Sequence, residues 1–381
     1  MSPNSLFNGI SGERVRDVRA CMGGYNLLTG LLDKHVKLPS ATNIHYPPRQ
    51  LYDGLLYLSM GRGYAESSME DLRLQYGADA PCGGAFLYRL KKLGYDDAYS
   101  MLTRVNDELL SHLKKTGVLK GRVVCALDYT KVPYYGAFNP KVVRSKREKG
   151  TNLFYEYASL TIVEDGRRVV VYTRPVTLLD VKRDIVKELI TEAEKRGMMR
   201  IKLLLLDRAF YTVDCINLLD ELQVRFIMPC VCNGRVTAAV DSFGREGTLP
   251  FEIRDNSKHS ARFTMVVHKR KRDGTLIPFA TNIGRPSVKM IPREYRRRWG
   301  IETSFRKIKE VFGRTTSRSH NIRLIYFLTA QIIHNVWQVI NIQQKEPEQR
   351  RDDDDDEQRP KRPITMGTVI SVFKTHLNGR C

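Results

Sequence analysis

Two continuous apolar runs that each end on an aspartate constrain the fold of this chain more than any other feature. VVCALD ends on Asp128 and IKLLLLD ends on Asp207. Short runs of this kind, rich in valine and leucine, are typical of strands buried on both faces of a sheet. Because ligands collect at the carboxyl ends of strands in open α/β sheets, the two aspartates are expected to share one edge.

The segments around these runs complete an α/β core. Residues 152–163 and 167–176 alternate between apolar and polar side chains, and the EDG between them predicts a hairpin. The remaining predicted elements are a helix over 181–197, a helix over 211–223 and a short strand over 224–229.

The pattern differs on either side of this core. The predicted division is a helical N-terminal DNA-binding region (1–118), a first part of the core (119–229), a mostly β insertion (230–289), a second part of the core with the last helices (290–343), a charged disordered linker (344–363) and a C-terminal tail (364–381). In the first region, three short helices with a basic third one suit a helix-turn-helix-like reader of DNA as well as a plain helical bundle.

The charge balance points to a polyanionic partner. The chain carries 63 Lys plus Arg against 42 Asp plus Glu, a net charge of +21. Such an excess favours nucleic acid, although a basic surface that serves solubility has the same composition. No apolar run approaches the ~18 residues that span a bilayer, and the N-terminus lacks a secretory pattern, so a cytoplasmic, nucleoid-associated protein is expected.

The seven cysteines include no CxxC pair, so neither a disulfide framework nor a structural zinc site is supported. Cys230 and Cys232 are expected to be half-buried residues of a strand. This usage fits a reduced compartment.

The segment YRRRWGIETSFRKIK combines four chemically distinct side chains on one predicted helical face. They are Tyr295, Arg298, Glu302 and Lys309. At ~100° per residue, their spacings place them within roughly 60° of arc, beside an apolar stripe that begins at Ile301. The apolar stripe suits the core, whereas the polar face is explained either by a site or by an exposed ion-pair network.

Asp128, Asp207 and Glu302 form a set with a chemical use. Three converging carboxylates raise one another's pKa, and a divalent cation removes that conflict. Mg²⁺ prefers hard oxygen ligands and keeps waters that phosphate oxygens can replace. Two such ions could activate a nucleophilic oxygen and stabilise the leaving oxygen of a phosphodiester. Taken singly, an aspartate after a strand is more often a helix cap or a turn residue.

Three motifs resemble the catalytic signatures of bacterial and archaeal DDE transposases. They are DYT at 128–130, DRAFY at 207–211 and Y-x2-R-x3-E-x6-K at 295–309. The last is similar at every position to the signature of the insertion-sequence-4 type. The resemblance covers about 121 to 340 and implies a ribonuclease H-like α/β core with a mostly β insertion, preceded by an all-α region.

The resemblance also implies roles for these residues. Asp128, Asp207 and Glu302 would be catalytic and would bind Mg²⁺ or Mn²⁺, with two ions expected. Tyr295 and Arg298 would contact phosphates near the cut. The implied partner is double-stranded DNA, both element ends and target, bound by a homodimer, without a nucleotide cofactor or a membrane.

Further contacts with DNA are predicted in the basic segments. Beyond Lys309, which would hold the backbone of the element end, they are Arg208, then Lys141, Arg144, Lys146 and Arg147, and then Lys269, Arg270, Lys271 and Arg272 at a predicted hairpin tip. A solvated turn is the alternative for both basic runs.

One departure concerns the insertion. Better-known members of the group stack a flipped base on a tryptophan there, whereas the tryptophans of this chain, Trp299 and Trp337, lie outside it. The insertion offers Phe243, Phe251, Phe263 and Phe279 as alternatives for stacking.

The leading hypothesis is a transposase that nicks its element ends and joins the freed 3′ hydroxyl to DNA. A metal-dependent nuclease of the same fold is one alternative, and the Tyr-Arg-Lys stripe counts against it. A DNA-binding protein with a decayed catalytic core is another, and the complete set of three carboxylates counts against that.

Overall fold

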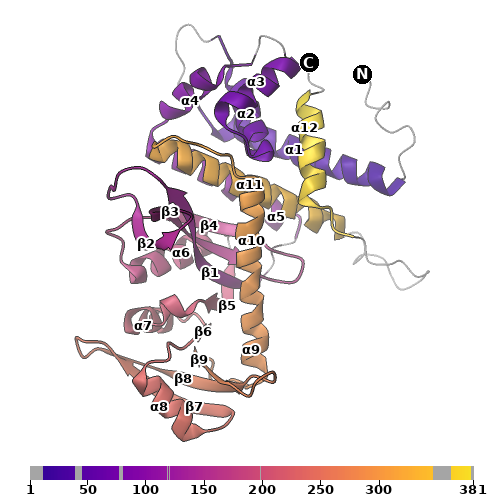
Figure 1. The fold of residues 1–381 in the computed structure, drawn as a ribbon. Helices are drawn as coiled ribbons and strands as arrows, with labels where there is room; N and C mark the ends of the chain where they lie inside the picture. Colours follow the sequence, from indigo (N-terminus) through magenta and orange to yellow (C-terminus); the bar gives the residue numbers. More distant parts are fainter. Residues whose placement is uncertain are drawn as a thin grey trace, which may run out of the picture. The chain divides into compact units, whose positions relative to one another are not determined.

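The structure is a computed structural model that describes residues 12–38, 45–76, 80–117, 119, 121–197, 199–345 and 362–378. The chain divides into two compact units. We call Leu119–Ser304 the sheet unit, and Met1–Val118 with Phe305–Cys381 the helical unit. The elements of both are labelled in Figure 1.

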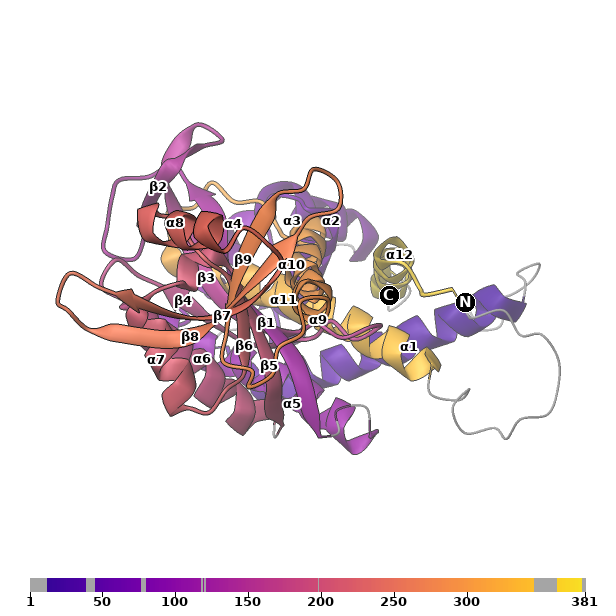
Figure 2. The same cartoon turned by 90° about the horizontal axis from the view of Figure 1, so that it is seen from below.

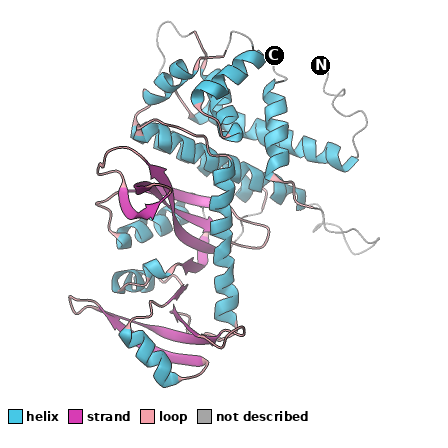
Figure 3. Cartoon of the chain, in the orientation of Figure 1, coloured by secondary structure: helices cyan, strands magenta, loops and turns pink. Residues whose placement is uncertain are grey.

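A mixed sheet forms the centre of the sheet unit, and all strands of the described residues belong to it (Figure 3). They are β1 (Arg122–Tyr134), β2 (Val143–Glu148), β3 (Thr151–Ile162), β4 (Val170–Val176), β5 (Arg200–Leu206), β6 (Phe226–Pro229), β7 (Gly247–Arg254), β8 (Ser260–Lys269) and β9 (Leu276–Thr281). The order is β2-β3-β1-β5-β6-β9-β8-β7, with β4 also paired to β3. The predicted α/β class is confirmed.

The two apolar runs form the neighbouring parallel strands β1 and β5. Their apolar residues are buried because sheet neighbours and helices cover both faces. The prediction that the first strand ends on Asp128 is wrong, since β1 continues to Tyr134. What ends there is the pairing with β5, whose last partners are Leu127 and Leu206, while the antiparallel pairing with β3 holds β1 extended as far as Tyr134.

Helices lie on both faces of this sheet (Figure 2). Helix α6 (Lys182–Gly197) packs against β3, β4 and β5, and α7 (Val213–Glu221) packs against α6 and β8. On the other side, α9 (Met290–Tyr295) contacts β6, and the 3-10 turn η4 (Arg296–Arg298) contacts β1 and β5. This second side carries Tyr295, Arg298 and Glu302.

The predicted insertion extends the core sheet. Its strands β7, β8 and β9 form antiparallel pairs, and β9 also pairs with β6. It contains a helix that the sequence did not predict, α8 (Gly234–Phe243), capped by the Asn233 side chain. Cys230 and Cys232 follow β6 in a loop, the first buried and the second exposed, so their assignment to a strand is wrong.

The helical unit is built around one long apolar helix. Its elements are α1 (Gly12–His35), α2 (Pro48–Gly61), α3 (Ala65–Tyr76), α4 (Gly83–Lys91), α5 (Tyr95–Lys115), the end of α10 (Trp299–Glu310), α11 (His320–Lys345) and α12 (Met366–Asn378). Helix α11 packs against α1, α2, α4 and α5. It therefore groups with the helical unit, whereas the sequence assigned it to the core, because nearly its whole circumference is buried among helices.

Most of the predicted charged linker falls outside the described residues. The predicted C-terminal tail contains α12, which packs against α1 and α2 through Met366, Val369 and Phe373. Among the described residues, no helix has both the length and the apolar character needed to cross a membrane.

Candidate active site

The two aspartates of the apolar runs lie side by side at one edge of the sheet. Leu127 and Leu206 are the last parallel partners of β1 and β5, and Asp128 and Asp207 follow them directly. The Asp128 Oδ1 accepts a hydrogen bond of 2.8 Å from the Tyr129 N–H. The Asp207 carboxylate accepts one of 2.7 Å from the Arg208 N–H and so caps the 3-10 turn η3 (Arg208–Phe210). The backbone thus orients both carboxylates.

A nearly continuous helical path carries Tyr295, Arg298 and Glu302. The sequence predicted one helix, whereas the structure has α9, the tighter turn η4 and then α10. The backbone angles stay in the right-handed helical region through this join, so the three side chains keep a common face. Gly300 lets this helix approach the residue after β3 closely, since a Cβ there would lie 3.0 Å from the Val163 side chain.

Arg298 joins two of the three carboxylates. Its Nη1 donates to Asp128 Oδ2 at 2.9 Å, and its Nη2 donates to Glu302 Oε1. The Arg298 side chain is 11% exposed, so this contact is shielded from water. Asp128 and Glu302, which are far apart in the sequence, therefore meet at the Arg298 guanidinium.

Burial shifts the pKa of two side chains here, Asp128 and Tyr295. It raises the pKa of the Asp128 carboxyl to about 6, although the nearby Arg298 and the Tyr129 N–H oppose this rise. The charge of Asp207 adds to the rise, which places Asp207 within electrostatic range of Asp128. Burial also raises the pKa of the Tyr295 phenol to about 12. At neutral pH the Tyr295 hydroxyl is therefore protonated and can donate a hydrogen bond.

The donor set suits a divalent cation in its chemistry. Asp128, Asp207 and Glu302 supply hard carboxylate oxygens, and the Arg298 guanidinium pairs with the first and the last of them. Across the residues that the structure describes, however, no three acidic, histidine or cysteine side chains are preassembled around a common point. A divalent cation at these carboxylates would compete with Arg298 for Asp128 and Glu302.

Two aromatic side chains that the sequence analysis did not select support the aspartates. Tyr129 and Phe210 stack with their ring centroids 5.1 Å apart and their planes 12° from parallel. Tyr129 follows Asp128 directly, and Phe210 ends the turn that Asp207 caps. The stack therefore links the two motif segments, and the signal for it was the aromatic residue in both DYT and DRAFY.

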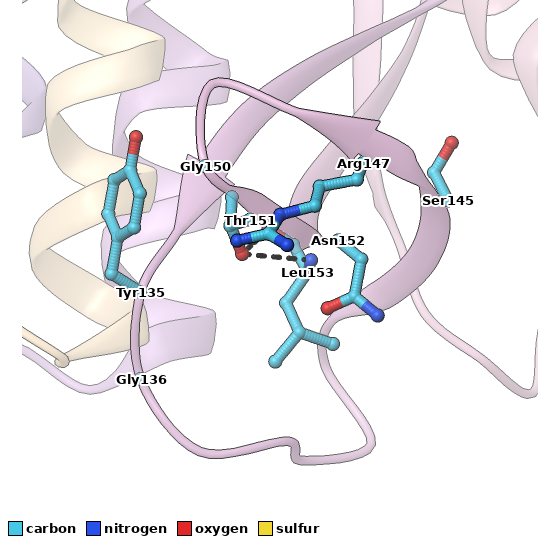
Figure 4. A pocket seen from close by; sticks show the side chains of 8 residues that line it. All are labelled: Tyr135, Gly136, Ser145, Arg147, Gly150, Thr151, Asn152 and Leu153. Atoms are coloured by element: carbon cyan, nitrogen blue, oxygen red, sulfur yellow. Dashed lines mark hydrogen bonds between the residues drawn. The ribbon is translucent and has the colours of Figure 1, made fainter.

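The predicted basic contacts lie elsewhere in the sheet unit. Arg144 is paired with Leu153 of β3, whereas Asp128 is paired with Ser159 of the same strand. Six residues of β3 separate these two partners, a distance of roughly 20 Å. Arg147 lines a polar cavity of about 560 Å³ near the β2–β3 turn, together with Tyr135 and Asn152 (Figure 4). Lys141 and Lys146 are exposed on the same segment. Arg208 is exposed beside Asp207.

The KRKR run forms the tip of the β8–β9 hairpin, as predicted. Arg270 pairs with Asp273 through contacts of 2.9 and 2.6 Å, so its guanidinium shapes the turn. Lys269, Lys271 and Arg272 are exposed around it. Lys309 is also exposed, on the part of α10 that belongs to the helical unit.

Two of the four insertion phenylalanines cannot stack on a base as they stand. Phe263 and Phe279 are buried, and Phe279 packs against Tyr295 with ring centroids 5.3 Å apart. Phe243 and Phe251 are half-buried. The expectation is therefore wrong for the first pair, because the sheet and α9 cover them.

Comparisons with known proteins identify the family of this chain. Residues 121–336 match the family model described as "Transposase DDE domain". Among solved structures, the chain is similar to piggyBac transposase in a synaptic complex with hairpin DNA, with a TM-score of 0.58 and 11% identity. That match covers 94% of this chain and 80% of the other. No curated protein sequence matches.

Proposed function

This chain belongs to the transposase DDE domain family, and we propose that it is a transposase of the insertion-sequence-4 type that excises and reinserts its own element. Membership makes it an enzyme of DNA transposition, and such enzymes cleave DNA and transfer strands with the help of divalent metal ions. The observation that carries the finer proposal is the cluster in which Asp128 and Glu302 share the Arg298 guanidinium beside Asp207.

In this proposal Asp128, Asp207 and Glu302 hold Mg²⁺ or Mn²⁺, two ions being expected. When bound, these ions would lower the pKa of the attacking oxygen and stabilise the leaving oxygen. The protein itself positions the DNA. The Tyr295 hydroxyl donates to a phosphate, Arg298 grips it with its fork of N–H groups, and Lys309 supplies a point charge to the backbone.

The proposed reaction has two steps, hydrolysis of a phosphodiester at the element end and then transfer of that end to target DNA. First, a water oxygen bonds to phosphorus, the bond from phosphorus to the 3′ oxygen breaks, and that oxygen takes a proton. The products are a 3′ hydroxyl and a 5′ phosphate. In the second step the freed 3′ hydroxyl loses its proton as its oxygen bonds to a phosphorus of the target strand. The bond from that phosphorus to the target's own 3′ oxygen breaks, and this oxygen takes a proton.

Two element ends must react together, so the working complex is proposed to be a homodimer on DNA. The similarity to a protein whose structure is a synaptic complex with hairpin DNA supports the choice of DNA as partner. The basic residues of the β2 segment and of the β8–β9 hairpin tip are proposed to hold its backbone. The helices of residues 1–118 are proposed to read the element end.

The test compares the full-length protein with Glu302→Gln on a labelled duplex of the element end, which is read from the DNA that flanks the gene. Wild type is expected to nick the end and join it to target DNA with Mg²⁺ or Mn²⁺. Glu302→Gln should bind with similar affinity but cut about 10³-fold more slowly or worse, the scale of loss for an essential catalytic group.

Glu310→Gln is the matched control, because it removes a carboxylate of the same helix that pairs with Lys307 instead. It should cut at the wild-type rate. Equal cutting by wild type and Glu302→Gln would contradict the proposed site. Nicking by wild type without any joined product would indicate a nuclease, and binding without any cutting would indicate a decayed enzyme.

A further inference from the structure

Exposed apolar side chains concentrate on two loops of the sheet unit. Half of the ten large hydrophobic residues exposed in the described part of the chain lie there, and we call them the edge patch: Tyr135, Phe138, Leu178, Leu179 and Val181. Leu179 is 83% exposed. The Leu178 N–H donates to the Pro140 carbonyl at 3.2 Å, so the two loops are neighbours. Grouped exposed apolar residues mark a contact surface.

The leucines of this patch lie at the same edge of the sheet as the catalytic carboxylates. Strand β4 runs parallel to β1, because both are antiparallel to β3. Asp128, Ser159 and Thr173 form one row across these three strands. Thr173 lies two strand spacings from Asp128 across the sheet, and the turn after β4 begins four residues further along β4. Together these steps place the turn roughly 15 Å from Asp128. At the start of α6, Lys182 Nζ donates to the Ala209 carbonyl at 2.5 Å, beside Asp207.

The leucines are presented by a braced turn. The Asp180 carboxylate accepts from the Thr177 N–H at 2.6 Å and from its hydroxyl at 2.8 Å. Asp180 also pairs with Arg174, whose other nitrogen contacts Glu188 at 2.6 Å. Because these bonds close the turn from within, Leu178 and Leu179 project from a rigid support.

The surroundings of the edge patch are basic. Lys141 and Arg144 lie on the segment after Phe138, and the Arg144 guanidinium sits 4.5 Å from the Phe138 ring centre. Lys182 and Arg183 follow Val181, and Arg183 is paired with Glu221 at 3.0 Å. A twofold contact with a second copy would oppose these like charges, since the same patch meets itself. A DNA duplex would instead neutralise them.

We propose that Leu178 and Leu179 form an apolar wedge that unstacks one base step of the duplex being cut. This proposal rests on the proposed function. In a duplex the extensive apolar surfaces are the base faces, which become available when a step is opened, and inserted leucines are a known means of opening one. At about 3.4 Å per base pair, the distance above places the opened step within about five base pairs of the cleaved phosphate.

The experiment uses the full-length protein and the element-end duplex. Permanganate reactivity of thymines is mapped on complexes of Glu302→Gln, which leave the DNA uncut, with and without Leu178→Ala plus Leu179→Ala. A reactive thymine is expected within about five base pairs of the cut, and it should disappear with the double change. Leu74→Ala, an equally exposed leucine on α3, is the matched control and should leave the pattern unchanged.

Cleavage supplies the second readout. With Glu302 intact, the double change should slow cutting of the paired duplex at least tenfold. A mismatch at the opened step should restore the rate to within about twofold of wild type, because the step is already unstacked. The wedge proposal would be overturned if the double variant cut the paired duplex at the wild-type rate. It would also be overturned if the double change left the permanganate pattern unchanged.

A third outcome would also overturn the wedge: the double variant cuts the mismatched duplex slowly as well, and light scattering shows that its complex with DNA has a lower mass. The two leucines would then belong to an interface between copies of the chain. Failure of the proposed function is a separate result, because wild type itself would then fail to cut.

Discussion

At the scale of single residues, Arg298 has two uses that exclude one another. Its guanidinium pairs with the carboxylates of Asp128 and Glu302. In the proposed reaction it holds a phosphate. Both partners are anions, so one side chain can pass from the carboxylates to the DNA as a divalent cation enters. Arg298 then couples metal entry to phosphate contact.

Arg298→Gln should therefore strengthen Mn²⁺ binding to the DNA-free protein by about tenfold, because the carboxylates lose the cation that competes for them. Electron paramagnetic resonance of free Mn²⁺ during a titration measures this affinity. Arg297→Gln, which removes a neighbouring guanidinium paired with Glu294, should leave it unchanged. Unchanged or weaker binding by Arg298→Gln would show that Arg298 does not compete with the metal.

At the scale of elements, close backbone approaches decide how helices meet. Helix α4 begins where it crosses the start of α3, and a Cβ at Gly83 would lie 2.6 Å from Glu66 Cα. The Glu66 Cα is a backbone atom, so it cannot move out of the way by a rotamer change as the end of a side chain could. The next residue, Gly84, has open space around its Cβ position.

Gly83→Ala should destabilise the protein by about 1–3 kcal/mol, the range for forcing an extra methyl group into a packed contact. Gly84→Ala is the matched change at the same helix start. It should be neutral or stabilising by up to about 1 kcal/mol, since alanine is the better helix former. Urea unfolding of each variant measures the difference, and equal stability of the two would contradict the crossing.

The β2 segment offers a test of its proposed DNA contacts. Replacing Arg144, Lys146 and Arg147 by glutamine should lower the slope of log K against log salt by up to about 2.7, at about 0.9 per lost phosphate contact. Lys187→Gln with Lys195→Gln on α6 is the control and should leave the slope unchanged. Fluorescence anisotropy at several salt concentrations gives the slopes. An unaltered slope in the triple variant would assign these residues to a solvated surface.

At the scale of the whole molecule, the net positive charge is expected to serve DNA binding, and the divalent metal is expected to serve cutting. The net charge of +21 should make DNA binding steeply dependent on salt. The carboxylate cluster, in contrast, contributes little to holding DNA, because its own charge is negative. Binding and cutting should therefore respond to different conditions.

Removal of divalent ions with EDTA should stop cutting completely while changing the affinity for the element end by less than about threefold. Raising salt from 50 to 200 mM should weaken binding about 10³-fold if six or more phosphates are held. Anisotropy and gel assays of the same samples separate the two effects. Cutting that continues in EDTA would contradict a metal-dependent reaction.

Local periodicity in the sequence was enough to predict several of the secondary-structure elements. The apolar runs form β1 and β5, and the hairpin at 164–166 joins β3 to β4. Tyr295, Arg298 and Glu302 lie on one helical face although a 3-10 turn interrupts the helix. These features follow from the spacing of side chains along a regular backbone, which is written in neighbouring residues.

The tertiary structure decided which of these elements meet. Register between β1, β3 and β5 set Asp128 beside Asp207 and extended β1 past the predicted end. Packing placed α11 with the helical unit, buried Phe263 and Phe279, and brought Arg298 to both Asp128 and Glu302. Such contacts join residues far apart along the chain, and their free energy depends on pairing and burial that exist only once the elements have come together.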